Sequence, residues 1–295
     1  MIVTGEIPAV RVARWSNPTL SWGVVPTMGF LHEGHLSLVR RARVENDRVG
    51  VSVFVNPTQF APDEDLDTYP RSLAQDLELL AAEGVDLVFT PIPSTMYPEG
   101  FQTSVTVEQL ARPLEGASRP SHFQGVATVV AKLFNIFQPN RAYFGQKDAQ
   151  QAAVIRQMVV DLNFNLEVVV CPIVREDDGL AMSSRNVKLN HEQRQAATVL
   201  YRALHAAAER LRQGETSGEK LRELMRSVVG AESLASLNYA SVADPLSLLE
   251  LDHVEGKALL SLAVFFDAVR LIDNVLVETP TTAGSKNQSR LERGK

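Results

Sequence analysis

The sequence predicts an α/β fold, with a doubly wound parallel sheet domain followed by a smaller α+β C-terminal domain. Short apolar runs alternate with helical periodicity along the first part of the chain, as in βαβ units whose parallel sheet is covered on both faces. After Cys171 and Pro172 the alternation ends, and helical repeats lead into strand-like runs. A chain of 295 residues is long enough for two domains and a sizeable core. The first domain is therefore expected to be Rossmann-like.

Five apolar runs are predicted to be the strands of the parallel sheet: Trp22–Val25, Val49–Val55, Val85–Thr90, Arg141–Phe144 and Leu166–Val170. Four helical stretches lie between them or after them, near residues 35–47, 70–83, 125–137 and 148–162. The third helix is apolar almost all round, which predicts burial and is consistent with a subunit interface. Because such sheets bind ligands at the carboxyl ends of their strands, we expect functional residues directly after the strands.

The second part of the chain is predicted to be a small α+β domain. Apolar residues recur at helical spacing over 197–211 and 221–228. Three strand-like runs follow, at Leu237–Val242, Ala258–Phe266 and Val269–Val277. The predicted domains cover residues 1–173 and 174–279. Residues 280–295 are polar and are predicted to form a disordered tail.

The composition limits the classes of partner. The formal net charge is -6, and so acidic a chain is a poor general nucleic-acid binder. No apolar run approaches the length of about 18 residues that a membrane helix needs, and no signal-peptide pattern opens the chain. The single cysteine, Cys171, excludes an internal disulfide and predicts a reducing compartment. We therefore expect a cytoplasmic protein that binds neither nucleic acid nor a membrane.

The stretch from Pro26 to His35 is the most informative motif. It joins a predicted strand to a predicted helix and places His32 and His35 three residues apart, with glycines around them. The start of a helix favours phosphate, and imidazoles there can stabilise a phosphate whose charge grows in a transition state. This H-x-G-H pattern resembles the signature of the nucleotidylyltransferase superfamily. The alternative is a tight turn with two surface histidines.

Two other strand ends carry polar residues. Asn56 and Gln59 follow the second strand, and their amides suit a substrate with hydroxyl groups; the alternative is an Asn-Pro turn with exposed amides. Gly145, Lys147 and Asp148 follow the fourth strand. Lys147 opposes the dipole of the helix that it precedes, as expected for a cation that meets phosphate. Asp148 is predicted to cap that helix.

The loop from Val174 to Asn186 contains Ser183, Ser184 and Arg185. Two hydroxyl donors beside a guanidinium can surround the oxygens of a triphosphate. The loop is similar to the mobile phosphate-binding loop found late in class I synthetases and related transferases. The alternative is a flexible linker between the two domains.

Three further residues have two interpretations each. Asp76 lies in the helix predicted to open at Tyr69-Pro70-Arg71. It is either a solvated surface residue or a Mg²⁺ ligand that acts through one carboxylate. Arg119 and His122 either contact substrate or cap the helix that follows them. No group of residues has the spacing of a zinc site.

Six strings in this order resemble the pantothenate synthetase (pantoate–β-alanine ligase) family: PTMGFLHEGH, FVNPTQF, YPR, HFQGVATVVAKLF, FGQKDAQQ and VREDDGLAMSSRN. They lie within residues 25–190, and a fainter match at Arg270–Asn274 lies beyond them. The resemblance implies that ATP adenylates pantoate with release of pyrophosphate. β-Alanine then attacks enzyme-bound pantoyl adenylate to give pantothenate and AMP. It also implies Mg²⁺ and a homodimer.

The resemblance further implies roles for individual residues. The catalytic residues would be His32, His35, Lys147 and Arg185. The residues that bind ATP would be Met28, His35, Gly145, Lys147, Asp148, Val174, Met182, Ser183, Ser184 and Arg185. The residues that bind pantoate would be Met28, Asn56, Gln59 and Gln151. Asp76 would be the Mg²⁺ ligand, and the second domain would act as a lid.

Three alternatives stay open at this point. The first is another adenylyl- or cytidylyltransferase of the same superfamily. The second is an RNA-directed synthetase, against which the acidic chain and the small second domain count. The third is a catalytically silent binding protein, against which the intact His32, His35 and Lys147 count. No general base for the β-alanine step is evident.

Overall fold

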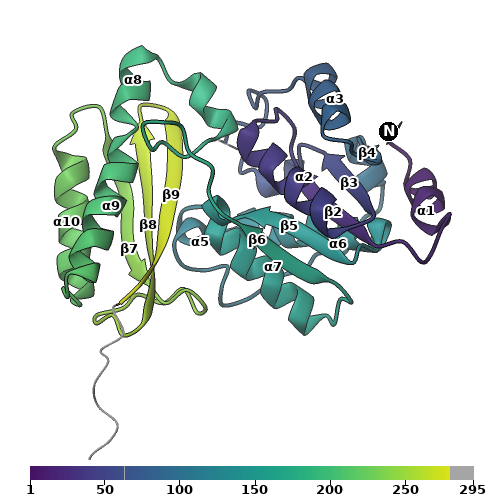
Figure 1. The fold of residues 1–295 in the computed structure, drawn as a ribbon. Helices are drawn as coiled ribbons and strands as arrows, with labels where there is room; N and C mark the ends of the chain where they lie inside the picture. The colour runs from purple at the N-terminus through teal and green to yellow at the C-terminus, as the bar shows by residue number, and fades with distance from the viewer. Residues whose placement is uncertain (63, 280–295) are drawn as a thin grey trace, which may run out of the picture.

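A computed structural model describes residues 1–62 and 64–279. Its parallel strands are β1 (Ile2–Thr4), β2 (Trp22–Thr27), β3 (Arg48–Val53), β4 (Leu87–Phe89), β5 (Arg141–Gly145) and β6 (Glu167–Cys171). They form one sheet with the order β1-β4-β3-β2-β5-β6, which confirms the predicted doubly wound α/β class (Figure 1). The strand order reverses between β2 and β5, and α/β sheets bind their ligands at such a switch point.

Helices cover both faces of this sheet. One face packs against α1 (Ile7–Trp15), α6 (His122–Phe137) and α7 (Ala149–Asp161). The other face packs against α2 (Glu33–Glu45) and α3 (Leu73–Ala82). Short helical segments in the connections are η1 (Pro57–Gln59), α4 (Pro93–Met96), α5 (Glu115–Ser118) and η2 (Gln146–Asp148). The predicted burial of α6 is confirmed, and its own domain accounts for that burial without a subunit interface.

Three features of the first domain differ from the prediction. The sequence patterns missed β1 and α1. β1 has only three residues at the edge of the sheet, where Ile2 and Val3 are about half exposed, so it shows no clear alternation. The predicted start of α3 at Pro70 is also wrong, because Ser72 is its N-cap and Leu73 its first residue. Pro70 lies in the loop before the helix.

The C-terminal domain packs helices against an antiparallel sheet. The strands are β7 (Ser236–Ala243), β8 (Lys257–Phe266) and β9 (Val269–Glu278), in that order. The helices are α8 (His191–Ala196), α9 (Val199–Arg212) and α10 (Gly218–Gly230), and the 3₁₀ segment η3 (Ser184–Lys188) precedes them. Apolar residues of α9, α10 and the sheet form a core separate from those of the parallel sheet. The predicted α+β class is confirmed.

Two further predictions concern the C-terminal tail and membrane-spanning helices. The tail predicted to be disordered, residues 280–295, lies outside the described residues. Within residues 1–62 and 64–279, no helix combines the length and apolar character needed to cross a membrane.

Candidate active site

All but two of the predicted site residues line one cleft of about 1420 Å³ between the two sheets. The carboxyl ends of β2 and β5 line one side, and the loop after β6 together with β9 lines the other. The predicted residues that line it are Met28, His32, His35, Gln59, Gly145, Lys147, Asp148, Gln151, Val174, Met182, Ser183, Ser184 and Arg185. Asn56 and Asp76 do not line the cleft.

His32 and His35 form the N-terminal cap of α2. Nδ1 of His32 accepts a hydrogen bond from the backbone N–H of Gly34 (3.1 Å), and Nδ1 of His35 accepts one from the backbone N–H of His32 (3.3 Å). Because both Nδ1 atoms accept, we infer that each neutral ring carries its hydrogen on Nε2. The ring centroids are 4.1 Å apart, so the two rings lie side by side. The alternative of two surface histidines is wrong, since both rings are partly buried.

Both imidazoles are neutral at physiological pH. Burial, the neighbouring ring of His32 and the positive charge of Lys147 lower the pKa of His35 to about 3. Burial and the charge of Lys147 lower the pKa of His32 to about 4. Lys147 acts on both rings because it lines the same cleft. Neutral N–H donors can meet phosphate oxygens without the desolvation cost of two more buried charges.

Asp76 supports the turn before α2 and does not face the cleft. Its side chain is 1% exposed, and its two oxygens accept the backbone N–H groups of Phe30 (2.9 Å) and Leu31 (2.7 Å). The turn needs this support because Gly29 and Phe30 both have positive φ angles, 83° and 52°. The interpretation of Asp76 as a solvated surface residue is therefore wrong, and its role as a Mg²⁺ ligand stays a prediction.

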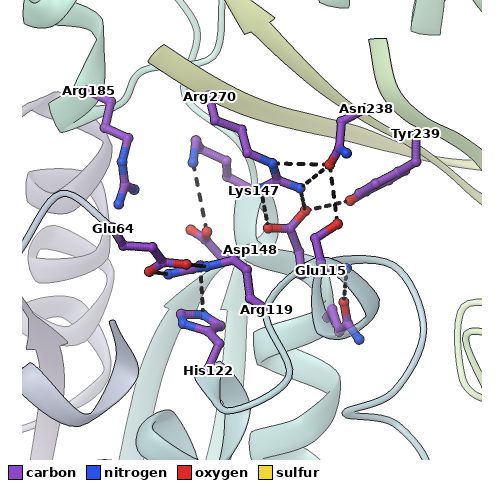
Figure 2. Close-up of polar contacts among 12 residues, drawn as sticks. Glu64, Glu115, Arg119, His122, Lys147, Asp148, Arg185, Asn238, Tyr239 and Arg270 are labelled. Atoms are coloured by element: carbon purple, nitrogen blue, oxygen red, sulfur yellow. Dashed lines mark hydrogen bonds and ion pairs between the residues drawn. The ribbon is translucent and has the colours of Figure 1, made fainter. Parts of the chain in front are cut away.

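Lys147, Asp148 and Arg185 point into the same space, as Figure 2 shows. Lys147 lies on η2, and its Nζ is 3.8 Å from Oδ1 of Asp148. Asp148 occupies the N-cap position of α7, but its side chain makes no capping hydrogen bond, so the predicted capping role is wrong. The carboxylate instead balances part of the charge of Lys147 inside the cleft.

The Ser183–Arg185 loop contacts the H-x-G-H turn. Oγ of Ser184 donates a hydrogen bond to the carbonyl oxygen of Phe30 (3.2 Å), and Oγ of Ser183 accepts one from the backbone N–H of Arg185 (3.2 Å). The guanidinium of Arg185 pairs with both oxygens of Asp65 (3.1 and 2.9 Å). Burial acts to raise the pKa of Asp65, but its pairing with Arg185 and Lys188 lowers it to about 2. The loop is thus held to the first domain by specific contacts, unlike a flexible linker.

Asn56 lies beneath Gln59 and orients it. Nδ2 of Asn56 donates to Oε1 of Gln59 (3.1 Å) and to the carbonyl oxygen of Gly125 (3.2 Å). Its Oδ1 accepts from the hydroxyl groups of Thr58 (3.0 Å) and Tyr97 (2.7 Å). The alternative of exposed amides is wrong, since Asn56 is 1% and Gln59 8% exposed. Four protein groups thus satisfy the amide of Asn56, and its contact with pantoate stays a prediction.

Arg119 and His122 hold the backbone of Gln59. Nδ1 of His122 donates to the carbonyl oxygen of Gln59 (2.8 Å), and Nε2 lies 3.3 Å from a nitrogen of Arg119. Arg119 also pairs with Glu64 (2.5 Å), as drawn in Figure 2. Burial and the charge of Arg119 lower the pKa of His122 to about 4. Neither side chain caps α6, so the capping interpretation is wrong. Both line the cleft, so substrate contact stays open.

An ion pair that the sequence did not predict joins the two domains across the cleft (Figure 2). Arg270 on β9 donates two hydrogen bonds to Glu115 on α5 (2.6 and 2.8 Å). The hydroxyl of Tyr239 donates a third to the same carboxylate (2.9 Å). Arg270 also donates to Oδ1 of Asn238 (2.8 Å). The only sequence signal was the resemblance around Arg270, which assigned it no role.

Comparison with known proteins places this chain among ligases. The model of the family described as Pantoate-beta-alanine ligase matches residues 3–276. A pantothenate synthetase from Roseiflexus castenholzii is 61% identical over 274 residues, which cover 93% of this chain and 97% of that protein.

Two solved structures are also similar to this chain. Pantothenate synthetase from Thermus thermophilus has a TM-score of 0.89 at 49% identity, and the match covers 93% of this chain and 99% of that one. Pantoate-beta-alanine ligase from Francisella tularensis, solved in complex with β-γ ATP and β-alanine, has a TM-score of 0.77 at 39% identity. That match covers 94% of this chain and 97% of that one.

Proposed function

Since the chain belongs to the pantoate-beta-alanine ligase family and ligates pantoate to β-alanine with ATP, we propose that the cleft described above carries out both steps through pantoyl adenylate. The family match covers nearly the whole described chain and argues against another adenylyl- or cytidylyltransferase, an RNA-directed synthetase or a silent binding protein.

In the proposed first step, a carboxylate oxygen of pantoate attacks the α-phosphorus of ATP, and the bond to the β-phosphate oxygen breaks. Pyrophosphate leaves. In the second step, the amine of β-alanine attacks the acyl carbon and loses a proton, and AMP leaves. A free carboxylate is a poor electrophile, so adenylation supplies the leaving group. The first step requires positioning and charge stabilisation and needs no protein nucleophile.

One observation carries this proposal. His32, His35, Lys147 and the Ser183–Arg185 loop come from distant parts of the chain and line one cleft at the switch point of the sheet. We assign the two Nε2–H groups and the ammonium of Lys147 to the phosphates of ATP, where they stabilise charge in the transition state. Arg185 would join them after leaving or sharing Asp65, its partner in the structure.

We assign the remaining lining residues by their position. Gly145, Asp148, Val174 and Met182 would line the ATP site beside Lys147. The residues that would bind pantoate directly are Met28, Gln59 and Gln151, with Asn56 as the support of Gln59. Gln59 and Gln151 carry amides that can both donate to a carboxylate and accept from a hydroxyl group.

The described residues offer Mg²⁺ no cluster of three or more protein ligands. They contain no group of three or more His, Cys, Asp or Glu side chains that could hold a metal ion. The predicted ligand, Asp76, already accepts two backbone N–H groups and does not line the cleft. We therefore propose that Mg²⁺ arrives bound to the triphosphate of ATP, whose oxygens and water molecules are the ligands that this ion favours.

The remaining parts of the proposal concern the whole molecule. The C-terminal domain, residues 174–279, would act as a lid, since its Ser183–Arg185 loop lines the cleft and contacts the turn before α2. A homodimer and a cytoplasmic location stay predictions. Light scattering of the purified chain tests the first, and an oligomer other than a dimer would contradict it.

A turnover assay with ATP, Mg²⁺, pantoate and β-alanine tests the proposed function when each component is omitted in turn. We expect AMP only when ATP and both other substrates are present. Pantoate-dependent exchange between pyrophosphate and ATP should occur without β-alanine, because the first step is complete at that point. AMP formation that does not depend on pantoate would contradict the proposal. Faster exchange with another acid would favour the alternative transferase.

A further inference from the structure

Asp273 and Asn274 are neighbours on β9, and each holds a different segment of the phosphate site. The two side chains are 2% and 3% exposed. Successive residues of a strand point to opposite faces, so one short stretch of β9 can reach two separate segments. We propose that both are positioning residues that fix Lys147 relative to the Ser183–Arg185 loop. This inference rests on the proposed function.

Asn274 binds the turn that carries Lys147. Its Nδ2 donates to the carbonyl oxygens of Gln146 (2.9 Å) and Lys147 (2.8 Å), and its Oδ1 accepts from Nε2 of Gln146 (3.0 Å). Both hydrogens of the amide and its oxygen are therefore used on η2. The backbone of a residue proposed to be catalytic is thus held by a side chain of the other domain.

Asp273 binds the base of the phosphate-binding loop. Its carboxylate accepts two hydrogen bonds from Arg175 (2.6 and 3.0 Å) and one from the backbone N–H of Asn274 (2.8 Å). Arg175 also donates to the carbonyl oxygen of Gly179 (3.0 Å), which closes its own loop into a small hairpin. Ser183 follows directly after this hairpin, so the carboxylate anchors the segment that leads to the proposed phosphate donors.

Through these contacts, Lys147 and the Ser183–Arg185 loop are both held in position by the same strand, β9. Both must reach the same triphosphate, and a displacement of about 1 Å at a positioned group can cost about a hundredfold in rate. β9 meets both segments with buried, bonded side chains, so a shift of this strand moves both together. Neither Asp273 nor Asn274 has to touch substrate to affect the rate.

The first experiment compares Asn274→Ala with Asn46→Ala. Asn46 is a matched control: it is 7% exposed and donates to the carbonyl oxygen of Ala42 and the hydroxyl of Tyr143, away from the cleft. We expect Asn274→Ala to lower kcat of pantoate-dependent pyrophosphate exchange about tenfold or more, with the KM for pantoate within about twofold. Asn46→Ala should lower the unfolding temperature and leave kcat unchanged.

A double-mutant cycle separates positioning from stability. If Asn274 acts by placing Lys147, its substitution should change kcat by less than about twofold when Lys147→Ala is already present. Asn46→Ala should have the same small effect in both backgrounds. Equal tenfold losses from Asn274→Ala with and without Lys147 would overturn the inference.

Arg175→Lys tests the contact of Asp273 with the base of the loop. This substitution does not remove a buried side chain, because Arg175 is partly exposed. Lysine keeps the charge but loses the paired donors, so we expect the KM for ATP to rise and the KM for pantoate to hold. If Asn274→Ala does not fold, the KM values of Arg175→Lys alone test the inference. Wild-type rates from both variants, or an equal rise in both KM values, would overturn the inference. A wild-type chain without pantoate-dependent exchange would instead overturn the proposed function.

Discussion

The role proposed for the two histidines of the H-x-G-H motif depends on the hydrogen bonds of their Nδ1 atoms as much as on their spacing in the sequence. Their positions after a strand and at the start of a helix were predicted from the sequence alone. Their tautomer and low pKa could not be, because these depend on burial and on Lys147, which is distant in the chain. The tautomer is fixed by backbone N–H groups, and a sequence motif indicates only side chains, so these contacts could not be predicted from it.

Loss of one donor should slow adenylation. His35→Ala and Lys147→Ala should each reduce the rate of pantoate-dependent pyrophosphate exchange by about a hundredfold or more, because each removes a positioned group that stabilises charge on phosphate. Pantoate binding should change little. His191→Ala is the control, since His191 is exposed at the start of α8. Near-normal exchange from either variant would refute its role.

The same histidines predict how stability changes with pH. Burial first of all lowers the pKa of His32 and His122 to about 4 and that of His35 to about 3. The unfolded chain, with histidine pKa values of about 6.5, then binds more protons below pH 6.5. The free energy of unfolding should therefore fall as pH drops from about 6.5 to 4, by up to about 1.4 kcal/mol per pH unit for each histidine.

Urea unfolding at pH 7 and pH 5 measures this change. His122→Asn removes one titrating group, so its free energy of unfolding should fall less steeply than that of the wild type over the same interval. Stability that is equal at pH 7 and pH 5 in the wild type would show that the histidines are not buried as neutral rings.

At the scale of elements, the strand ends that carry the site could be predicted and their supports could not. Apolar runs and helical periodicity located β2, β3 and β5 and the polar residues after them. The burial of Asp76 was missed because its partners are backbone N–H groups, which every sequence has and no pattern marks. Asn56 was only partly understood for a related reason: four protein groups satisfy its amide, two of them distant in the chain.

Gly125 shows how one element positions another. A Cβ at Gly125 would lie 2.3 Å from the carbonyl oxygen of Thr58 and 2.7 Å from Cα of Gln59, so α6 can meet η1 only through a glycine. Gly125→Ala should push η1 away, cost about 1–3 kcal/mol in unfolding free energy and raise the KM for pantoate. Steady-state kinetics and urea unfolding measure the two effects.

Gly230→Ala is the control for this element. It also lies in a helix, but a Cβ there would meet nothing within 4 Å. It should keep the KM for pantoate and leave stability unchanged or raise it by about 0.5–1 kcal/mol. If Gly125→Ala behaved in the same way, the close contact between α6 and η1 would not position Gln59.

At the scale of the whole molecule, the order and class of the two domains followed from the sequence, but their contact did not. The chain has 29 Lys and Arg and 35 Asp and Glu residues, so the number of possible ion pairs is very large. The sequence around Glu115 and around Arg270 does not mark them as partners. Glu115 lies in a helix and Arg270 in a strand, and neither position requires a partner from the other domain. Only the packed fold brings the two elements together across the cleft.

This ion pair should couple the unfolding of the two domains. The side chains of Glu115 and Arg270 are only 9% and 18% exposed. Arg270→Met leaves the carboxylate of Glu115 buried without its cation, which typically costs about 3–5 kcal/mol. Each domain keeps its own apolar core, so the domains can then unfold separately. Calorimetry of the wild type should show one transition, and that of Arg270→Met should show two.

The double variant Glu115→Gln, Arg270→Met distinguishes a buried charge from a lost contact. A neutral amide can still accept the hydrogen bond from Tyr239, so the double variant should be more stable than Arg270→Met alone. If the double variant is instead the less stable of the two, the bonds that Glu115 keeps without Arg270 outweigh the cost of its buried charge. If Arg270→Met retains a single transition at the wild-type temperature, the ion pair does not couple the domains. The contacts of Asn274 with η2 and of Arg185 with Asp65 would then remain as polar contacts between the two domains.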